Sequence, residues 1–375
     1  MRASSALVHR TRPRGGLPQR FLSGLVERLK DKMAITDKKT RVIEGCDADR
    51  VPWQELMTDL QPVVLKGLVD AWPLVEAGRR SNEVAMAYLK SFYNGKTVGT
   101  FYGAPEIGGR FFYNDDVTSL NFESRRSPLD EVLAAIQEHL GEENAQSVYV
   151  GSTTIDACLP GLRSGNDLVF NDDMFADNAP LASIWIGNRT LASAHYDAPN
   201  NMACCAVGPR RYTLFPPEQI WNLYPGPIDL TPGGQAVSMV DFANPDLEKY
   251  PRFREAMEAA QVAELEPGDA LFYPSMWWHQ VEAFGAFNVM INYWWNTSPK
   301  FMGTPMNVLK HALLSLRDRP EHEKAAWKHV FDYYVFGSPE RPREHLPEQA
   351  HGDLGPIDDL KARRLRAELL NKLNR

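Results

Sequence analysis

Three residues of this sequence combine types and spacings that suit a metal ion. His195 and Asp197 stand two positions apart in the stretch SAHYDAPNN (193–201). Successive side chains of an extended strand alternate between its faces, so these two project the same way and can share one ion. A lone HxD tripeptide is weak evidence, because a surface histidine beside an aspartate is more often only a solvated pair. The case for a metal therefore depends on a third ligand.

The third candidate is His279, in the stretch FYPSMWWHQVE (272–282). Trp277, His279 and Val281 alternate onto one strand face among aromatic and apolar neighbours, where an unpartnered imidazole is costly to bury. A core histidine bonded to a carbonyl group explains this burial equally well. As a ligand, His279 completes a set of two histidines and one carboxylate, which leaves metal positions open as in non-haem iron(II) sites. A structural zinc site would be closed.

The elements that must position these ligands are short strands. From residue 147 to 295, β-rich runs alternate with Gly, Pro, Asn and Asp, which is typical of a β-sandwich or barrel. Turns are predicted at Gly208-Pro209 and Gly268-Asp269. The stretch 216–263 is too long for a simple turn and is expected to be a structured insertion near the mouth of the site. The runs predict strands at 148–151, 181–186, 202–207, 211–215, 270–273, 277–282 and 287–295.

Helices are predicted on both sides of this β-rich part. Apolar residues recur at helical spacing over 82–92 and 128–140, with Ser81 and Ser127 placed as N-caps. After Pro305 the β pattern stops, and helices are predicted at 308–316, at 325–336 with Gly337 as a cap, and at 357–373. The last helix carries a leucine stripe formed by Leu365, Leu369 and Leu373. The stripe could be buried against a second copy of the chain, but a helix that packs on its own barrel has the same pattern.

Composition limits the kind of protein this can be. With 375 residues, 43% of them hydrophobic and 24% charged, the chain falls in the range of globular proteins with a large core. A net charge of -7 disfavours nucleic acid as the bulk partner. The four cysteines lack CxxC spacing, which favours a reducing cytoplasm. No apolar run approaches the roughly 20 residues that span a bilayer, so no membrane partner is expected.

These motifs belong to a longer series that runs in order from about residue 60 to 300. Together they resemble the JmjC/cupin-like oxygenases, and among these the chain is similar to the asparaginyl hydroxylase that acts on hypoxia-inducible factor. Each piece is weak alone, but the set is specific. The pieces are QPVVLKG (61–67) with Trp72-Pro73, HYD (195–197) with Asn201, LFPPEQ (214–219) with LYP (223–225), VDFANPD (240–246) with Tyr250-Pro251, PGD (267–269), Tyr273-Pro274, WWH (277–279) and NYW (292–294).

The resemblance implies a mainly β fold, a double-stranded β-helix (jelly-roll or cupin barrel) with flanking helices and a C-terminal helical region. It implies iron(II) held by His195, Asp197 and His279, with 2-oxoglutarate and dioxygen as co-substrates. The predicted organisation is a disordered or mis-started segment at 1–33, the barrel domain with its N-terminal helices at 34–304, and the helical region at 305–375, which resembles the family's dimerisation region and points to a homodimer.

The resemblance also implies residues for the co-substrate. A lysine usually binds the distal carboxylate of 2-oxoglutarate, and Arg210 stands in its place here, where its two-pronged geometry keeps the chemistry possible. Tyr149 matches a tyrosine that reaches the same carboxylate, although a structural tyrosine is an equal alternative. Asn201 and Asn292 match polar residues near the co-substrate, and Trp294 is expected to wall the site or to belong to the core.

Strand parity separates the two adjacent arginines. Arg210 shares a face with Tyr212 and Leu214, while Arg211 lies on the other face, so only one arginine points inward.

The sequence predicts a 2-oxoglutarate-dependent hydroxylase, but it does not identify the substrate, which is a protein side chain or a small molecule. The alternative is a non-catalytic cupin-type protein that binds a metal or small molecule. An interaction scaffold that uses the C-terminal helices leaves the three ligands unexplained.

Overall fold

The computed structural model describes residue 36 and residues 38–374. The predicted N-terminal segment 1–33 therefore lies outside the described residues. Contacts between Cα atoms divide the chain into one compact unit that extends to Asn296 and a second that begins at Thr297. The first unit carries all the strands among the described residues and the second carries only helices.

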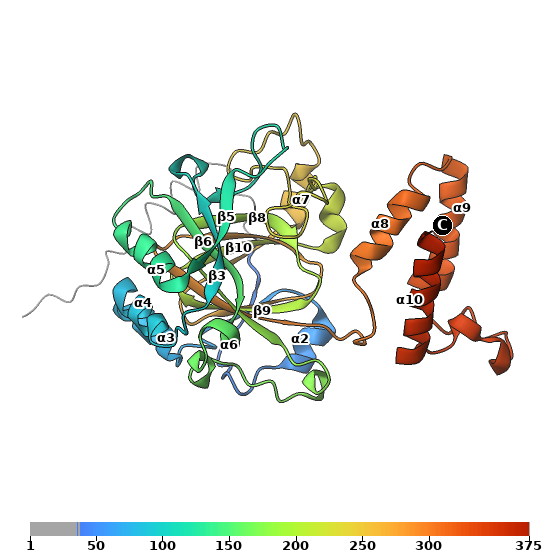
Figure 1. Ribbon diagram of the computed structural model, residues 1–375, viewed down its shortest axis with the longest axis horizontal. Helices are drawn as coiled ribbons and strands as arrows, with labels where there is room; N and C mark the ends of the chain where they lie inside the picture. The colour runs from blue at the N-terminus through green and yellow to red at the C-terminus, as the bar shows by residue number, and fades with distance from the viewer. Residues whose placement is uncertain (1–35, 37, 375) are drawn as a thin grey trace, which may run out of the picture. The chain divides into compact units, whose positions relative to one another are not determined.

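The strands form two sheets (Figure 1). Most neighbours are antiparallel, while β1 with β2 and β4 with β8 are parallel. The major sheet has nine strands in the order β1 (Arg41–Ile43), β2 (Val63–Leu65), β12 (Ala270–Tyr273), β9 (Asn200–Val207), β14 (Asn288–Trp295), β7 (Leu181–Gly187), β6 (Ser147–Thr154), β3 (Thr97–Gly103) and β5 (Phe122–Pro128). The minor sheet has five, in the order β11 (Gln261–Leu265), β10 (Arg210–Phe215), β13 (Trp278–Ala283), β8 (Thr190–Tyr196) and β4 (Arg110–Phe111).

Alternate residues of the central strand β9 enter different cores. Met202, Cys204 and Ala206 belong to the largest apolar cluster, which the major sheet shares with helices. Ala203 and Cys205 point the other way, into a cluster that both sheets share. All residues of β9 are buried for this reason. The two sheets thus face each other across a common interior.

Helices cover the outer face of the major sheet, and α3 and α4 lie side by side there (Figure 1). The predicted cap Ser81 is confirmed, because its hydroxyl accepts the backbone N–H of Val84 at the start of α4. The predicted cap Ser127 is wrong: this residue is part of β5, and its hydroxyl bonds to that of Tyr102. The helices are α2 (Trp53–Asp59), α3 (Pro73–Arg80), α4 (Asn82–Lys90), α5 (Leu129–Glu138) and the short α6 (Ile155–Cys158).

The insertion predicted at 216–263 has two roles. Its apolar residues, with α7 (Phe253–Ala259), pack on the outer face of the minor sheet against Phe215 and Trp278. Its last residues were expected to lie outside the sheet, but β11 pairs with β10 along the edge of the minor sheet. Of this insertion, Pro232 to Gln235 and Val237 line the pocket described below.

All seven predicted strands are present, with ends shifted by up to three residues. Gly208 and Gly268 have positive φ angles of 72° and 112° in the two predicted turns. The prediction of a mainly β jelly-roll fold with flanking helices is confirmed. One detail differs, because the described strands form two separate sheets and not a closed barrel.

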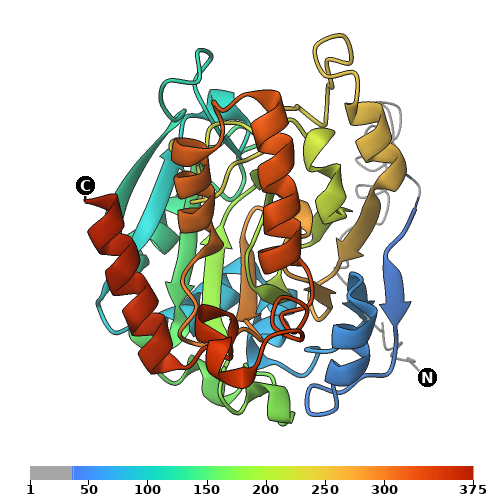
Figure 2. The same ribbon diagram turned by 90° about the vertical axis from the view of Figure 1, so that its right-hand side faces the viewer.

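The second unit contains α8 (Pro305–Ser315), α9 (Glu321–Phe331) with a π-helical turn at Asp332–Phe336, and α10 (Asp359–Leu373), which Figure 2 shows as separate helices in orange to red. The predicted cap Gly337 follows directly after the π-helical turn, where its φ of -84° is extended and not left-handed. None of the helices in the described part of the chain has the length and apolar character needed to cross a membrane.

Candidate metal centre

The two candidate histidines lie on neighbouring strands of the minor sheet. His195 is near the end of β8 and His279 near the start of β13, and the two residues are Cα partners in the ladder. Asp197 lies just beyond the end of β8 and not within a regular strand as its spacing from His195 suggested. It still projects toward both histidines, because only one residue separates it from His195.

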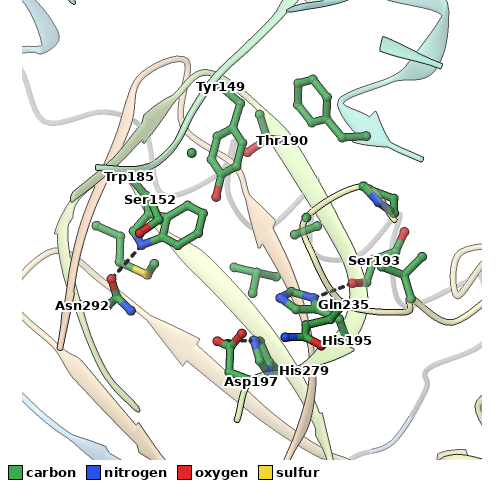
Figure 3. Close-up of a pocket in the computed structure, with 18 of the residues that line it drawn as sticks. Tyr149, Ser152, Trp185, Thr190, Ser193, His195, Asp197, Gln235, His279 and Asn292 are labelled. Carbon is green, nitrogen blue, oxygen red and sulfur yellow. Dashed lines mark hydrogen bonds and ion pairs between the residues drawn. The ribbon is translucent and has the colours of Figure 1, made fainter. Parts of the chain in front are cut away.

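The ligand atoms of these three side chains lie within 4.8 Å of one another. Figure 3 shows the side chains pointing toward a common point. Nε2 of His279 is 3.7 Å from Oδ2 of Asp197. His279 is buried, with 2% of its surface exposed, while His195 and Asp197 are partly buried. The structure therefore brings together the three residues that the sequence singled out.

The backbone fixes which nitrogen of each imidazole faces the centre. Nδ1 of His195 is 2.8 Å from the carbonyl of Ser193, and Nδ1 of His279 is 3.0 Å from that of Trp277. A carbonyl accepts only, so each Nδ1 carries the proton and each Nε2 keeps a lone pair. Burial lowers the pKa of His279 to about 4; the charge of His195 acts in the same direction and that of Asp197 opposes it. Near neutral pH the imidazole is therefore neutral, as a metal ligand must be.

The segment before β13 is bonded to the segment after β8. The backbone N–H of Met276 donates to the carbonyl of Asp197 at 2.8 Å, and the hydroxyl of Ser275 donates to that of Ala198. Ser275 also donates its backbone N–H to the side chain of Asn200. Met276 has a φ of 67°, a left-handed conformation that is rare for such a side chain. These bonds link the backbone of Asp197 to the strand that carries His279.

A cavity of about 440 Å³ opens between the sheets at these ligands. One wall is aromatic: Phe111 stacks on Tyr149 and Tyr149 on Trp185, with ring centroids 5.8 Å apart in both pairs. Trp294 contacts Trp185 edge to face. The lining residues carry only two formal charges besides the histidines, those of Asp197 and Arg210. The cavity is of the size and character of small-molecule sites.

Arg210 lines this cavity and is 3% exposed. Its Nε finds no hydrogen-bond partner, and no carboxylate of the described residues forms an ion pair with it. Arg211 points outward and its guanidinium bonds to Glu264 at 3.1 Å. The parity argument for the two arginines thus agrees with the structure. A buried guanidinium without an acid is costly, so this position is suited to an anionic ligand.

The other predicted co-substrate residues also line the cavity. Burial raises the pKa of Tyr149 to about 12, despite the opposing charge of Arg210, so its hydroxyl keeps its proton. Asn201 and Asn292 are fully buried and hydrogen-bonded to each other at 3.2 Å. The indole N–H of Trp294 has no partner in the described chain.

The sequence analysis missed several residues that line the site, and two of them are bonded to the predicted asparagines. Trp185 donates its indole N–H to Asn292 at 2.7 Å, and the hydroxyl of Tyr273 accepts a hydrogen bond from Asn201. The sequence did contain a signal for both residues. Trp185 and Tyr273 lie in strands whose other residues are mostly apolar, and a buried indole N–H or phenol hydroxyl needs a polar partner.

The donor set fits iron(II). Two neutral imidazoles and one carboxylate converge from one side, and the cavity leaves space on the other side for further ligands. The unpaired Arg210 in the same cavity fits the carboxylate of a dicarboxylic acid. Iron(II) and 2-oxoglutarate are therefore compatible with the residues present.

A family model described as a cupin-like domain matches residues 49–301, more than half of the chain. The match includes both sheets except β1, and all of the candidate site residues.

Several curated proteins are similar to this chain. Lysine-specific demethylase JMJ31 of Arabidopsis thaliana is 36% identical over 214 residues, which cover 50% of this chain and 38% of that protein. HSPB1-associated protein 1 of Bos taurus is 34% identical over 131 residues, 34% of this chain and 26% of that protein. Jumonji C domain-containing protein 5 of Drosophila melanogaster is 26% identical over 268 residues, 68% of this chain and 61% of that protein. The chain thus matches between about a quarter and three fifths of the length of these relatives.

Proposed function

Because the chain belongs to the cupin-like domain family, we propose that it is an iron(II)- and 2-oxoglutarate-dependent oxygenase of the JmjC type. One observation carries the proposal: a single cavity contains both the converging ligand atoms of His195, Asp197 and His279 and the buried, unpaired cation of Arg210. These groups are suited to a metal ion and an anionic ligand, and 2-oxoglutarate would supply the anion.

His195 and His279 would hold the metal through their Nε2 atoms and Asp197 through its carboxylate. Iron(II), with 2-oxoglutarate and dioxygen, supplies the oxidising power to hydroxylate a C–H bond, with succinate and carbon dioxide as the other products. The protein's own contribution is to orient the target and keep water out.

Arg210 would bind the far carboxylate of 2-oxoglutarate through two parallel N–H bonds. Tyr149 can donate a further hydrogen bond to that carboxylate, because its hydroxyl remains protonated over the physiological range. The aromatic wall of Phe111, Tyr149 and Trp185 supports a dry site, in which such charge-assisted bonds are stronger than in water.

We infer that the substrate enters beside the segment 232–235, which is contributed by the insertion. The reaction that we favour is hydroxylation of a protein side chain or of a small molecule, because the motifs resemble those of a hydroxylase. Demethylation is the competing outcome, since the Arabidopsis relative carries the name of a lysine-specific demethylase.

The alternative function is a metal- or small-molecule-binding protein without turnover. The two are separated by mixing the protein with iron(II), ascorbate and 2-oxoglutarate and measuring both succinate and co-substrate binding. We expect slow succinate formation that is lost in His279→Ala and kept in His139→Ala, a histidine paired with Glu142 outside the cavity. Binding without succinate would favour the alternative, and the absence of both would overturn the oxygenase.

A further inference from the structure

A row of four polar-tipped side chains runs across the floor of the cavity. Trp185, Asn292, Asn201 and Tyr273 come from β7, β14, β9 and β12, which are consecutive neighbours in the major sheet. All four line the cavity, and the two asparagines have 0% and 1% of their surface exposed. The metal-binding histidines belong to the other sheet, so this row approaches the candidate centre from the opposite side.

Hydrogen bonds connect the row to Asp197. The indole N–H of Trp185 donates to Oδ1 of Asn292 at 2.7 Å, a bond that is visible in Figure 3. Nδ2 of Asn292 donates to Oδ1 of Asn201 at 3.2 Å. Nδ2 of Asn201 donates one hydrogen to Oδ2 of Asp197 at 3.4 Å and the other to the hydroxyl of Tyr273. Within the described residues, Asn201 is the only side chain that donates a hydrogen bond to Asp197.

The two ends of the row fix its direction. An indole N–H can only donate and a carboxylate can only accept, whereas each asparagine can be turned by exchanging its oxygen and nitrogen. With Trp185 donating, Asn292 must present its oxygen to the indole and its N–H to Asn201. Asn201 must then present its N–H to Asp197. Tyr273 does not constrain the orientation of Asn201, because its hydroxyl can either donate or accept a hydrogen bond.

We propose that Trp185 is a positioning residue for Asp197: it sets the orientation of both asparagines, so that Asn201 holds the carboxylate with an N–H. This inference rests on the proposed function in taking Asp197 as a metal ligand. Asp197 needs such support because it lies beyond the end of β8, where the bond from Met276 fixes its backbone carbonyl but not its carboxylate. Without the indole, Oδ1 of Asn292 loses its donor and only the carboxylate still orients the amide pair, so Asn201 holds Asp197 less firmly.

The test is the affinity of the protein for Co(II), measured without oxygen by titration of the visible absorption of the bound ion. We expect Trp185→Phe to weaken Co(II) binding about tenfold, the lower end of the range for loss of an outer-shell partner. Asn292→Ala interrupts the same row and is expected to have a similar effect. It also keeps the test usable if Trp185→Phe does not fold.

Trp295→Phe is the matched control. This tryptophan neighbours the row on β14, is buried on the opposite face of the sheet, and has an indole N–H without a partner among the described residues. Its replacement removes the same chemical group but no bond of the row. We expect folded Trp295→Phe to bind Co(II) like the wild type.

A double-mutant cycle separates positioning from a general structural effect. Trp185 and Asn201 share no hydrogen bond and are linked only through Asn292. In an Asn201→Ala background we therefore expect Trp185→Phe to cause no further loss of Co(II) affinity, whereas independent effects would add.

Two results would overturn the inference while leaving the proposed function intact. One is a folded Trp185→Phe variant with the Co(II) affinity of the wild type. The other is a loss of Co(II) affinity on Trp185→Phe that is equally large in the wild-type and the Asn201→Ala background. If the wild-type protein itself bound Co(II) no better than His279→Ala, the metal site and the proposed function would fail, and this inference with them.

Discussion

His195 and His279 are Cα partners on adjacent strands, and their ring centroids lie 4.4 Å apart. In both residues Nδ1 lies against the carbonyl of the residue two positions earlier. The same short-range bond thus orients both rings, and the pairing of β8 with β13 sets the distance between them. The imidazole half of the candidate centre is therefore organised by backbone structure.

Removal of the metal should lower thermal stability. An ion that binds only the folded state stabilises it by about 2.7 kcal/mol at a free concentration of about 100 times its Kd. We expect Co(II) to raise the Tm of the wild-type protein and chelation by EDTA to reverse the rise. His195→Ala should show no Co(II)-dependent shift, while His139→Ala should respond like the wild type. A similar shift in His195→Ala would place the ion elsewhere.

Arg210 should determine the affinity for 2-oxoglutarate. A hydrogen bond to a charged group contributes about 1.5–3 kcal/mol, so Arg210→Met should weaken the binding of 2-oxoglutarate to the Co(II)-loaded protein by roughly 10- to 150-fold. The affinity of Arg210→Lys for 2-oxoglutarate should lie between those of the wild type and Arg210→Met, because lysine keeps the charge but not the two-pronged geometry. Calorimetric titration measures each Kd.

The neighbouring arginine provides the control for this prediction. Arg211 points out of the cavity toward Glu264, so Arg211→Met should bind 2-oxoglutarate like the wild type. If Arg211→Met lost affinity and Arg210→Met kept it, the co-substrate would not lie against Arg210.

Glu282 should reduce stability at neutral pH. Desolvation raises the pKa of this partly buried carboxyl, although the charge of Arg211 and a hydrogen bond with Gln280 oppose the rise. A carboxyl whose pKa is higher in the folded than in the unfolded state binds more protons when folded, so stability is lost as the pH rises through these values. Glu282→Gln resembles the protonated form.

We therefore expect Glu282→Gln to have a higher Tm than the wild type at pH 7. The difference should shrink as the pH falls toward about 4, where a free glutamate becomes protonated. A variant that is less stable than the wild type at pH 7 would mean that the attraction between Glu282 and the charge of Arg211 outweighs the cost of burial.

The ligands and the strands that carry them were predictable because their signals are local. The alternation of His195 with its neighbours, the apolar surroundings of His279 and the parity of Arg210 depend only on residues nearby in the chain. The two glycine turns and the cap Ser81 are local features of the same kind.

Features that depend on distant partners were not predictable. β5 has the sequence FESRRSP, which is mostly exposed and carries three charges, and it is a strand only because it pairs with β3 along the edge of the sheet. Ser127 was taken for a cap because the hydrogen-bond partner of its hydroxyl, Tyr102, lies 25 positions away in the chain. The role of Trp185 depends on Asn292, which is 107 positions distant.

The turn that precedes Arg210 should tolerate no side chain at Gly208. Its φ of 72° is rare for other residues, and an added Cβ would lie 2.2 Å from Oδ1 of Asn288 and 2.8 Å from the carbonyl of Phe287. Asn288 cannot move away easily, because its side chain bonds to Gly285 and Asn188. Gly208→Ala should therefore destabilise the protein by at least the roughly 1–3 kcal/mol of backbone strain.

Gly45→Ala is the matched control for Gly208. Gly45 has a nearly identical φ of 74°, but nothing lies within 4 Å of the position of its Cβ. Urea unfolding of the two variants separates the cost of backbone strain from that of the steric clash. Gly208→Ala should lose more free energy of unfolding than Gly45→Ala. Equal losses would show that the neighbours of Gly208 give way.

The C-terminal unit should mediate self-association. Among its described residues, 297–374, only Pro342, Gly355 and Ala362 are buried, so its helices form no apolar core of their own. Large apolar side chains are correspondingly exposed: 80% for Leu314, 76% for Phe336, 71% for Leu360, and about half for Leu369 and Leu373 of the leucine stripe. Helices of this length are marginal alone in water, and apolar patches of this kind mark interaction surfaces.

We propose that a second copy of the chain covers these side chains, because identical apolar helices provide mutually complementary surfaces in a two-fold dimer. Light scattering on the full chain should give twice its mass of 42.3 kDa. The triple variant Leu314→Glu, Phe336→Glu and Leu360→Glu should shift the mass toward one chain, since burying three carboxylates costs far more than exposing them. Its Co(II) binding should persist, because none of the three residues lines the cavity. A wild-type protein that stays at the mass of one chain at high concentration would contradict the proposal, and the apolar faces would then need a different partner.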